Sequence, residues 1–170
     1  DRVDAIMVKL GTSGPITGRS IFMSKETAEG FATATFEDGD VFRFAGPNGA
    51  LEFFVTETQL LTAIGQAATA DLDTDAIAQS AAGDIFVSFA DDELVNGISA
   101  QDGSLIYIPA ISIIYDGNGN VSSIGSGAAF IAATEAQMSA MMIASGVKTS
   151  VGGVPSLTEL TALEIDPAGG

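Results

Sequence analysis

The sequence predicts a mainly β protein made of two tandem repeat units of short antiparallel strands, each unit with one inserted helix. Three observations predict this class: short apolar runs bounded by Gly, Asn and Asp, alternation of apolar and polar residues within these runs, and segments that recur in the same order. The alternative is an α+β domain whose duplicated halves pack face to face around the two helices. The length of 170 residues suits one compact domain or a short array of small units.

Five segments of the first half of the chain recur in the second half, in the same order. The matched pairs are residues 4–6 with 75–77, 21–24 with 85–88, 38–44 with 102–108, 46–49 with 116–119 and 56–60 with 134–138. A looser copy of the first segment occurs at Thr161-Ala162-Leu163. The matches predict a first unit over residues 1–70, a second over 71–156, and the first strand of a third unit, or a closing strand, over 157–170.

Short apolar runs mark the expected strands, and helical spacing of apolar residues marks one helix in each unit. The expected strands cover residues 3–10, 20–23, 41–44 and 51–55 in the first unit, and 75–79, 84–90, 104–108, 111–115 and 121–124 in the second. The first helix is expected over residues 56–68, where Thr56 can cap its start. The second is expected over residues 134–144, and its methionines are typical of adaptable core filling rather than of a cofactor site.

Composition excludes several kinds of chemistry. The chain has 22 acidic and 6 basic residues, a formal net charge of -16, and no Cys or His. Because phosphate binding needs Lys and Arg, we expect no nucleic-acid partner. Without Cys or His the chain has no disulfide, no thiolate nucleophile, no imidazole base and no structural zinc site of the usual kind. We also expect no membrane insertion, because the stretch closest to a span, residues 122–147, contains Glu135.

Acidic residues dominate the middle of the chain, and no Lys or Arg occurs between Arg43 and Lys148. Bound cations would relieve the repulsion within such a stretch. Two sets of oxygen-bearing side chains at alternate positions are candidate metal ligands: Asp116, Asn118 and Asn120, and Asp71, Asp73 and Asp75. This spacing suits a hard cation, and Ca²⁺ is the expected ion. The alternative is that the first set forms a hairpin turn and the second a solvated acidic loop.

Paired carboxylates are the remaining route to catalysis in a chain without Cys or His. Asp38 with Asp40, or Asp84 with Asp102, have the residue type of a pair that cleaves a glycosidic bond. Nothing in the sequence places either pair across a cleft, and a repeat duplicates such acids for structural reasons. We therefore assign no catalytic residue and no cofactor-binding residue, and we expect no enzymatic activity.

Three segments resemble a known kind of repeat. The runs TDAIAQSAAGDIFVSFADD, EDGDVFRFAGPNGALEFF and LTALEIDPAGG are similar to the tandem β-propeller-like repeats of exported bacterial proteins. The run YDGNGN also resembles the hairpin of YD-type repeats. The resemblance implies a β-repeat scaffold in an extracellular or cell-envelope setting, and it carries no catalytic residue.

The repeat organisation and the missing catalytic side chains predict a non-catalytic structural or binding module of an exported or surface assembly. Duplicated β units leave edge strands open for pairing, so the expected partners are other protein subunits, including copies of the same chain. The alternatives are a carboxylate-based glycan-active enzyme domain and a capsid or filament subunit. The repeat predicts one common strand order for residues 3–60 and 75–138.

Overall fold

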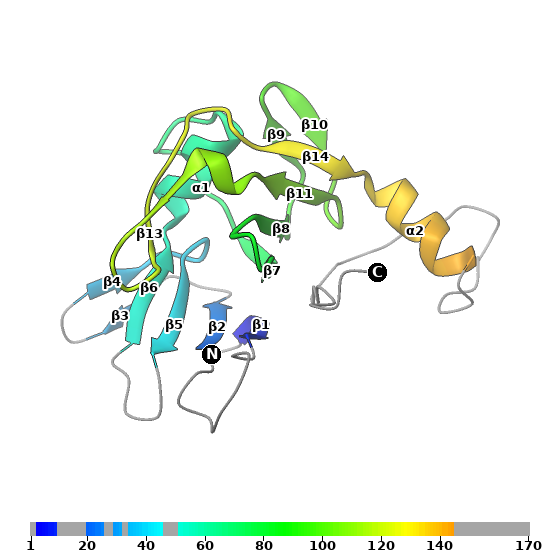
Figure 1. Cartoon of the computed structure of the whole chain (residues 1–170). Helices are drawn as coiled ribbons and strands as arrows, with labels where there is room; N and C mark the ends of the chain where they lie inside the picture. The colour runs from blue at the N-terminus through cyan, green and yellow to red at the C-terminus, as the bar shows by residue number, and fades with distance from the viewer. Residues whose placement is uncertain (1–2, 10–19, 26–28, 32–33, 46–50, 145–170) are drawn as a thin grey trace.

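The chain is mainly β, as predicted (Figure 1). A computed structural model describes residues 3–9, 20–25, 29–31, 34–45 and 51–144. These residues form two four-stranded antiparallel sheets and three two-stranded hairpins. One helix follows the last strand of each four-stranded sheet, so each sheet and its helix make up one unit.

The first sheet has the strand order β1-β2-β5-β6. Its strands are β1 (Val3–Lys9), β2 (Ser20–Lys25), β5 (Val41–Ala45) and β6 (Leu51–Val55). A short hairpin of β3 (Glu29–Phe31) and β4 (Ala34–Phe36) connects β2 to β5, and helix α1 (Glu57–Ile64) follows β6. The first unit is therefore a meander with one hairpin inserted between its second and third strands.

The second sheet repeats this layout, with the order β14-β11-β8-β7. Its strands are β7 (Thr74–Gln79), β8 (Ile85–Phe89), β11 (Leu105–Ile108) and β14 (Phe130–Ala133). A hairpin of β9 (Glu93–Val95) and β10 (Ile98–Ala100) again connects the second strand to the third, and helix α2 (Glu135–Ala144) again follows the last. The connection from β11 to β14 also holds a 3₁₀ turn, η2 (Ala110–Ser112), and a third hairpin, β12 (Ile113–Tyr115) and β13 (Val121–Ile124).

The two units share their strand register as well as their strand order. Equivalent cross-strand pairs are Phe22 with Arg43 in the first sheet and Phe86 with Tyr107, 64 positions later, in the second. The register shift in the last strand pair also recurs, after Val41 in the first sheet and after Leu105 in the second. Register and bulges are set residue by residue, so the two halves are copies of one mainly β unit rather than an α+β domain.

Several expected boundaries differ from the structure. The first helix ends at Ile64 rather than at residue 68, because Gly65 takes a left-handed conformation with φ 77° and caps it. The strand expected over residues 111–115 starts only at Ile113, since the preceding residues form the 3₁₀ turn. The sequence predicts no strand at the positions of β3, β4, β9, β10 and β14. The third-unit or closing strand expected over residues 157–170 lies outside the described residues.

One of the five sequence matches is not a structural equivalence. Residues 116–119 close the β12–β13 hairpin, whereas β5 and β6 are joined by residues 46–50 alone. The two segments look alike because Asn and Gly favour tight turns wherever a hairpin closes. Residues 46–50 themselves lie outside the described part of the chain.

The last of the five matches builds the same capping box twice. In α1 the Thr56 hydroxyl accepts the Gln59 N–H at 3.3 Å, and the Gln59 side-chain oxygen accepts the Thr56 N–H at 2.9 Å. In α2 Thr134 and Gln137 exchange the same two hydrogen bonds, at 3.3 and 2.9 Å. Each box satisfies backbone donors at the start of a helix, and it thereby fixes where the helix leaves the last strand.

Helix α1 lies at the centre of the hydrophobic core. Leu60, Leu61, Ala63 and Ile64 are buried in a cluster that includes apolar side chains of both sheets. Backbone N–H groups of the second unit donate to carbonyls in the last turn of α1, where a helix cannot satisfy all of its own acceptors. The donor–acceptor pairs are Asn96 with Ile64, Gly127 with Thr62 and Ala129 with Ala63, at 2.7, 3.0 and 2.9 Å. The second unit therefore completes the helix of the first.

Gly39 lies in the turn between β4 and β5, with the segment before β7 packed directly on it. A Cβ at this position would collide with the Leu72 carbonyl oxygen and would lie 2.6 Å from Cγ of Glu57. We expect Gly39→Ala to lower the free energy of unfolding by about 1–3 kcal/mol, because backbone atoms must move to admit the methyl group.

Urea denaturation checks this expectation. Gly117→Ala is the matched control, since a Cβ there meets no atom within 4 Å. Equal losses of stability in the two variants would contradict the packing described for Gly39.

Candidate metal centre

Three carboxylates from separate parts of the chain come together at the junction of the two units. Asp38 lies in the turn before β5, Glu57 is the first residue of α1, and Asp71 lies in the segment that leads into β7. One carboxylate oxygen from each residue lies within 4.8 Å of those of the other two. Glu57 is buried, Asp38 is half-buried and Asp71 is exposed, so the cluster is closed on one side and open to solvent on the other.

The buried side chain of Asp40 holds the turn against the start of α1. One of its carboxylate oxygens accepts the Glu57 N–H at 2.7 Å, and the other accepts the Glu37 N–H at 3.0 Å. The Thr74 hydroxyl donates to the Gly39 carbonyl at 3.1 Å and ties the same turn to β7. This position of Glu57 is therefore fixed by hydrogen bonds from both units.

The second unit repeats the anchor with a neutral residue. Ser104 occupies the position of Asp40, and its hydroxyl accepts the N–H of Glu135, the first residue of α2, at 3.2 Å. Asp102 and Glu135 stand where the first unit has Asp38 and Glu57. The anchoring of a helix start by the turn before the third strand is thus a feature of the repeat unit itself.

Electrostatic repulsion is concentrated on Glu57. The pKa of Glu57 is raised from 4.5 to about 7, first by burial and then by the negative charges of Asp38, Asp71, Asp40 and Glu37. Burial also raises the pKa of Asp40, although the N–H groups of Glu57 and Glu37 oppose this effect. Such a cluster can hold a proton or bind a cation, because either would neutralise part of its charge.

Only one member of the predicted set Asp71, Asp73 and Asp75 belongs to this cluster. Asp71 faces Asp38 and Glu57. Asp75 is buried in β7, and the backbone carbonyl of Asp73 accepts the Ala90 N–H at 3.1 Å. The alternate spacing of the three acids therefore continues into a strand, and only Asp71 faces the cluster.

The second predicted set, Asp116, Asn118 and Asn120, forms a hydrogen-bonded turn at the tip of the β12–β13 hairpin. One carboxylate oxygen of Asp116 accepts the backbone N–H groups of Asn118 and Asn120, both at 2.8 Å. These bonds lower the pKa of Asp116, and the bond from the Asn120 N–H has the largest effect. The guanidinium of Arg43 donates to the Asn118 carbonyl, so a fixed cation already lies on this loop.

Two of the four carboxylates considered for catalysis, Asp40 and Asp84, accept hydrogen bonds from donors that stabilise the fold. Asp40 anchors α1, as described above. Asp84 accepts hydrogen bonds from the Ala110 N–H at 2.9 Å, the Ser80 hydroxyl at 2.7 Å and the Tyr107 hydroxyl at 3.0 Å, and these donors lower its pKa. Both residues therefore have structural hydrogen-bond partners.

Sequence reasoning missed Glu57 as a site residue and considered Asp38 only as half of a catalytic pair. The cluster joins positions 38, 57 and 71, which have no regular spacing. An Asp-Gly-Asp turn and a Glu in the first turn of a helix are each common structural features. Asp40 holds these two features together within the first unit, and the docking of the second unit adds Asp71.

Comparison of the chain with protein-family models, curated proteins and solved structures finds no match to any of them. The strands of the described residues form separate open sheets and no closed propeller. No helix in the described part of the chain has the length and hydropathy needed to cross a membrane.

The raised pKa of Glu57 predicts that the free energy of unfolding depends on pH. In the window between its ordinary value of 4.5 and about 7, the folded protein binds the Glu57 proton more tightly than the unfolded chain, so stability falls as pH rises through this window. We expect Glu57→Gln, measured in EDTA, to gain stability over the unchanged protein as pH rises from about 5 to about 8.

Urea denaturation across this pH range provides the measurement. Asp91→Asn, at an exposed position after β8, is the control for the loss of one acidic side chain. A Glu57→Gln effect that is the same at both ends of the pH range would contradict the prediction.

Proposed function

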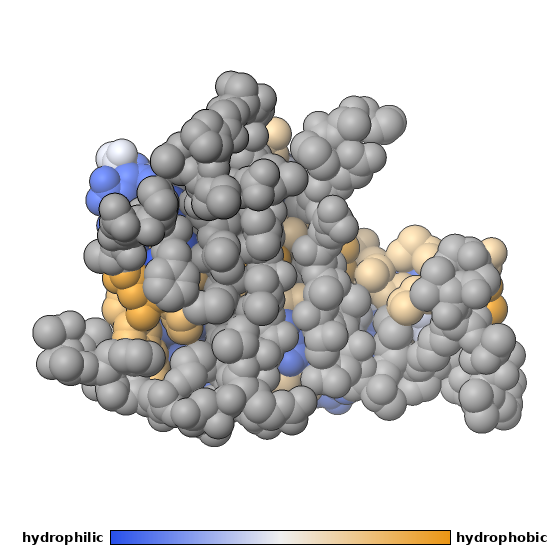
Figure 2. All heavy atoms as spheres, turned by 90° about the horizontal axis from the view of Figure 1, so that it is seen from below, coloured by the Kyte–Doolittle hydropathy of each residue, from blue (hydrophilic) through white to orange (hydrophobic). Residues whose placement is uncertain are grey.

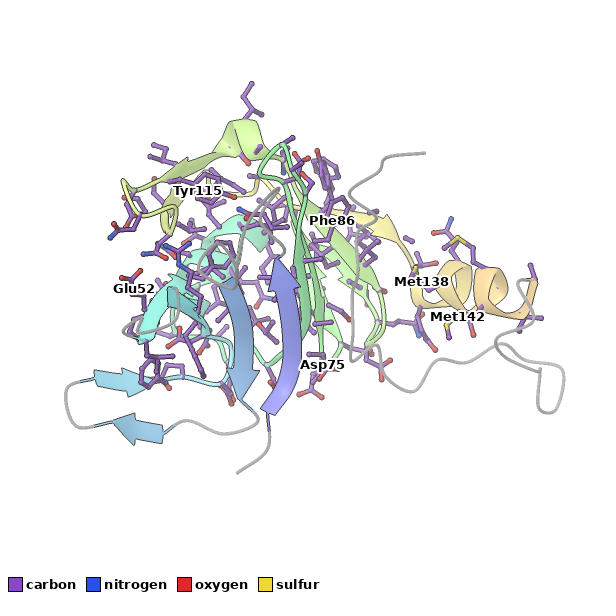
Figure 3. The ribbon with its side chains drawn as sticks, turned by 60° about the horizontal axis from the view of Figure 1, so that its bottom comes forward. Glu52, Asp75, Phe86, Tyr115, Met138 and Met142 are labelled. Atoms are coloured by element: carbon purple, nitrogen blue, oxygen red, sulfur yellow. The ribbon has the colours of Figure 1, made fainter. Side chains whose placement is uncertain are left out.

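We propose that the protein is a non-catalytic structural module of an exported or surface assembly, and that it associates with other protein subunits, including copies of itself. The observation that carries this proposal is the contrast between the two equivalent helices. Helix α1 is buried between the units, while α2 extends beyond the body of the two sheets (Figures 1 and 3). A unit of this kind therefore has a helix that a following unit can cover.

The contrast holds residue by residue. The four buried residues of α1, Leu60, Leu61, Ala63 and Ile64, correspond to Met138, Ser139, Met141 and Met142 of α2, 78 positions later. Of these four, only Ser139 is buried, and Met141 is 54% exposed. Figure 3 shows Met138 and Met142 on the projecting helix, away from the sheets. Methionine side chains suit such a contact surface because they adapt to the shape of a partner.

Further exposed apolar side chains lie on the second unit. Leu94, Ile98, Ile111, Ile114 and Phe130 are all at least half exposed. Phe130 belongs to β14, the edge of the second sheet, whose outer side pairs with no other strand of the described residues. Figure 2 shows apolar residues on the side of the molecule where α2 lies and also on the opposite side of this face. Exposed apolar patches and open strand edges are typical of surfaces that bind other proteins.

The exported setting rests on sequence. The chain resembles tandem repeats of exported bacterial proteins, and its 22 acidic residues against 6 basic ones disfavour nucleic acid as a partner. An acidic surface also keeps separate molecules soluble until a specific apolar contact joins them. A capsid or filament subunit would be one form of the same proposal, since both are regular assemblies of one chain.

One observation favours a different class, the carboxylate-based glycan-active domain. Glu57 has a pKa raised to about 7 beside two further carboxylates, and a carboxyl group of this kind can act as a general acid. The cluster lies against the closely packed turn at Gly39, which leaves less room for a sugar than for an ion. We therefore rank this class second.

The mass of the native particle tests the proposal. Light scattering after size-exclusion chromatography is expected to give a particle heavier than one chain over a wide concentration range. Met141→Gln and Phe130→Thr each remove an exposed apolar contact, and we expect about tenfold weaker association in each case.

The control is Thr58→Gln, at an exposed position of α1, which is expected to leave the particle mass unchanged. A strict monomer that hydrolyses a polysaccharide would overturn the proposal and support the enzyme instead.

A further inference from the structure

The carboxylate of Glu57 has no hydrogen-bond or ion-pair partner among the residues that the structure describes. Glu57 is only 7% exposed, yet no residue of the described chain donates a hydrogen bond to its carboxylate, and its charged neighbours are all acidic. An acidic group in such a place ordinarily has an Arg, a Lys or several N–H donors beside it. Its carboxylate points instead at those of Asp38 and Asp71. A cation bound from solution would therefore stabilise the negative charge of Glu57.

Among the described side chains around the cluster, none offers such a partner. No Lys or Arg occurs between Arg43 and Lys148. Arg43 is engaged elsewhere, since its guanidinium contacts Glu52 at 3.5 Å and donates to the Asn118 carbonyl. A small inorganic cation suits this place, because the close packing of Gly39 against Glu57 and Leu72 leaves little room for a larger group.

We propose that Asp38, Glu57 and Asp71 bind one Ca²⁺ ion at the junction of the two units. Calcium–oxygen distances are about 2.3–2.6 Å, so ligands on opposite sides of one ion lie about 4.6–5.2 Å apart. The three oxygens lie within 4.8 Å of one another, a spacing that allows all three to contact a single ion. The exposed side of the cluster, at Asp71, leaves space for the water ligands that complete the coordination of calcium.

This inference goes beyond the proposed function and does not depend on it, since a monomer could bind the ion equally well. Two ligands come from the first unit and the third from the segment entering the second. Ca²⁺ therefore joins the units and removes the repulsion that their docking creates. The site differs from the Asp116 turn, where Arg43 already supplies a positive charge.

Calorimetric titration of the full chain with CaCl₂ in metal-free buffer is the first test. We expect one site, and at least about tenfold weaker binding in Glu57→Gln and in Asp71→Asn, because each loses a charged ligand. Asp91→Asn and Asp116→Asn are the controls for a lost acidic group outside the site, and each is expected to keep the affinity within about twofold. MgCl₂ is titrated in parallel and is expected to bind more weakly, since its coordination is smaller and more rigid.

Thermal unfolding provides a second readout that separates loss of the site from loss of the fold. Ca²⁺ is expected to raise the melting temperature of the unchanged protein above that in NaCl of equal ionic strength. Glu57→Gln is expected to melt higher than the unchanged protein in EDTA, because it removes a buried repelled charge, and to show no response to Ca²⁺.

Three results would overturn the inference. They are equal melting temperatures in calcium and matched sodium, calcium binding that survives in Glu57→Gln but is lost in Asp116→Asn, and tighter binding of Mg²⁺ than of Ca²⁺. Equal melting temperatures would mean that no specific ion binds. Binding lost only in Asp116→Asn would place the site at the hairpin turn, and tighter Mg²⁺ binding would mean that Ca²⁺ is not the preferred ion.

Discussion

The structure depends on the insertion of α1 between the two units. A helix of eight residues is too short to be stable in water by itself, so its existence depends on its surroundings. Its start is fixed by the capping box and by Asp40, which belong to the first unit. Its end is completed by N–H groups of Asn96, Gly127 and Ala129, which belong to the second. The core around α1 therefore contains buried side chains of both units.

The same docking explains why carboxylates crowd at the junction. The segment that carries Asp71 must pass over the turn at Gly39 to reach β7, and this path brings it to the start of α1. Burial of apolar residues stabilises the arrangement, while the charges of Asp38, Glu57 and Asp71 oppose it. The repulsion among these carboxylates therefore marks the point where we expect a ligand.

The sequence predicts the repeat and the main strands because these depend on local patterns. The recurrence of Asp-Ala-Ile, Ile-Phe and Thr-Glu corresponds to β1 and β7, β2 and β8, and the two helix starts. Strands β9 and β14 have only three and four residues, so alternation alone does not reveal them. The match of residues 46–49 with 116–119 was wrong because turn composition reports a tight turn and not its place in the unit.

The candidate site could not be predicted from local sequence patterns. Asp116 and its neighbours have the spacing of a metal loop, yet backbone N–H groups occupy the Asp116 carboxylate. Glu57 has no distinguishing neighbours in sequence, and its importance comes from burial and from two acids brought to it by tertiary contacts. Periodicity can predict which residues form strands, but it contains no information on which loops meet across the junction of two units.

The identical ladders of the two sheets have a consequence for how the chain finds its structure. Because β1 and β7 present the same hydrogen-bonding register to β2 and β8, backbone geometry alone does not distinguish correct pairing from an exchange of first strands. Correct pairing is favoured by proximity, since short connections, residues 10–19 and 80–84, join each first strand to its own neighbour. At high protein concentration, strands of neighbouring molecules compete with the strand of the same chain. We therefore expect exchange of a first strand between molecules to be the main misfolding route of this architecture.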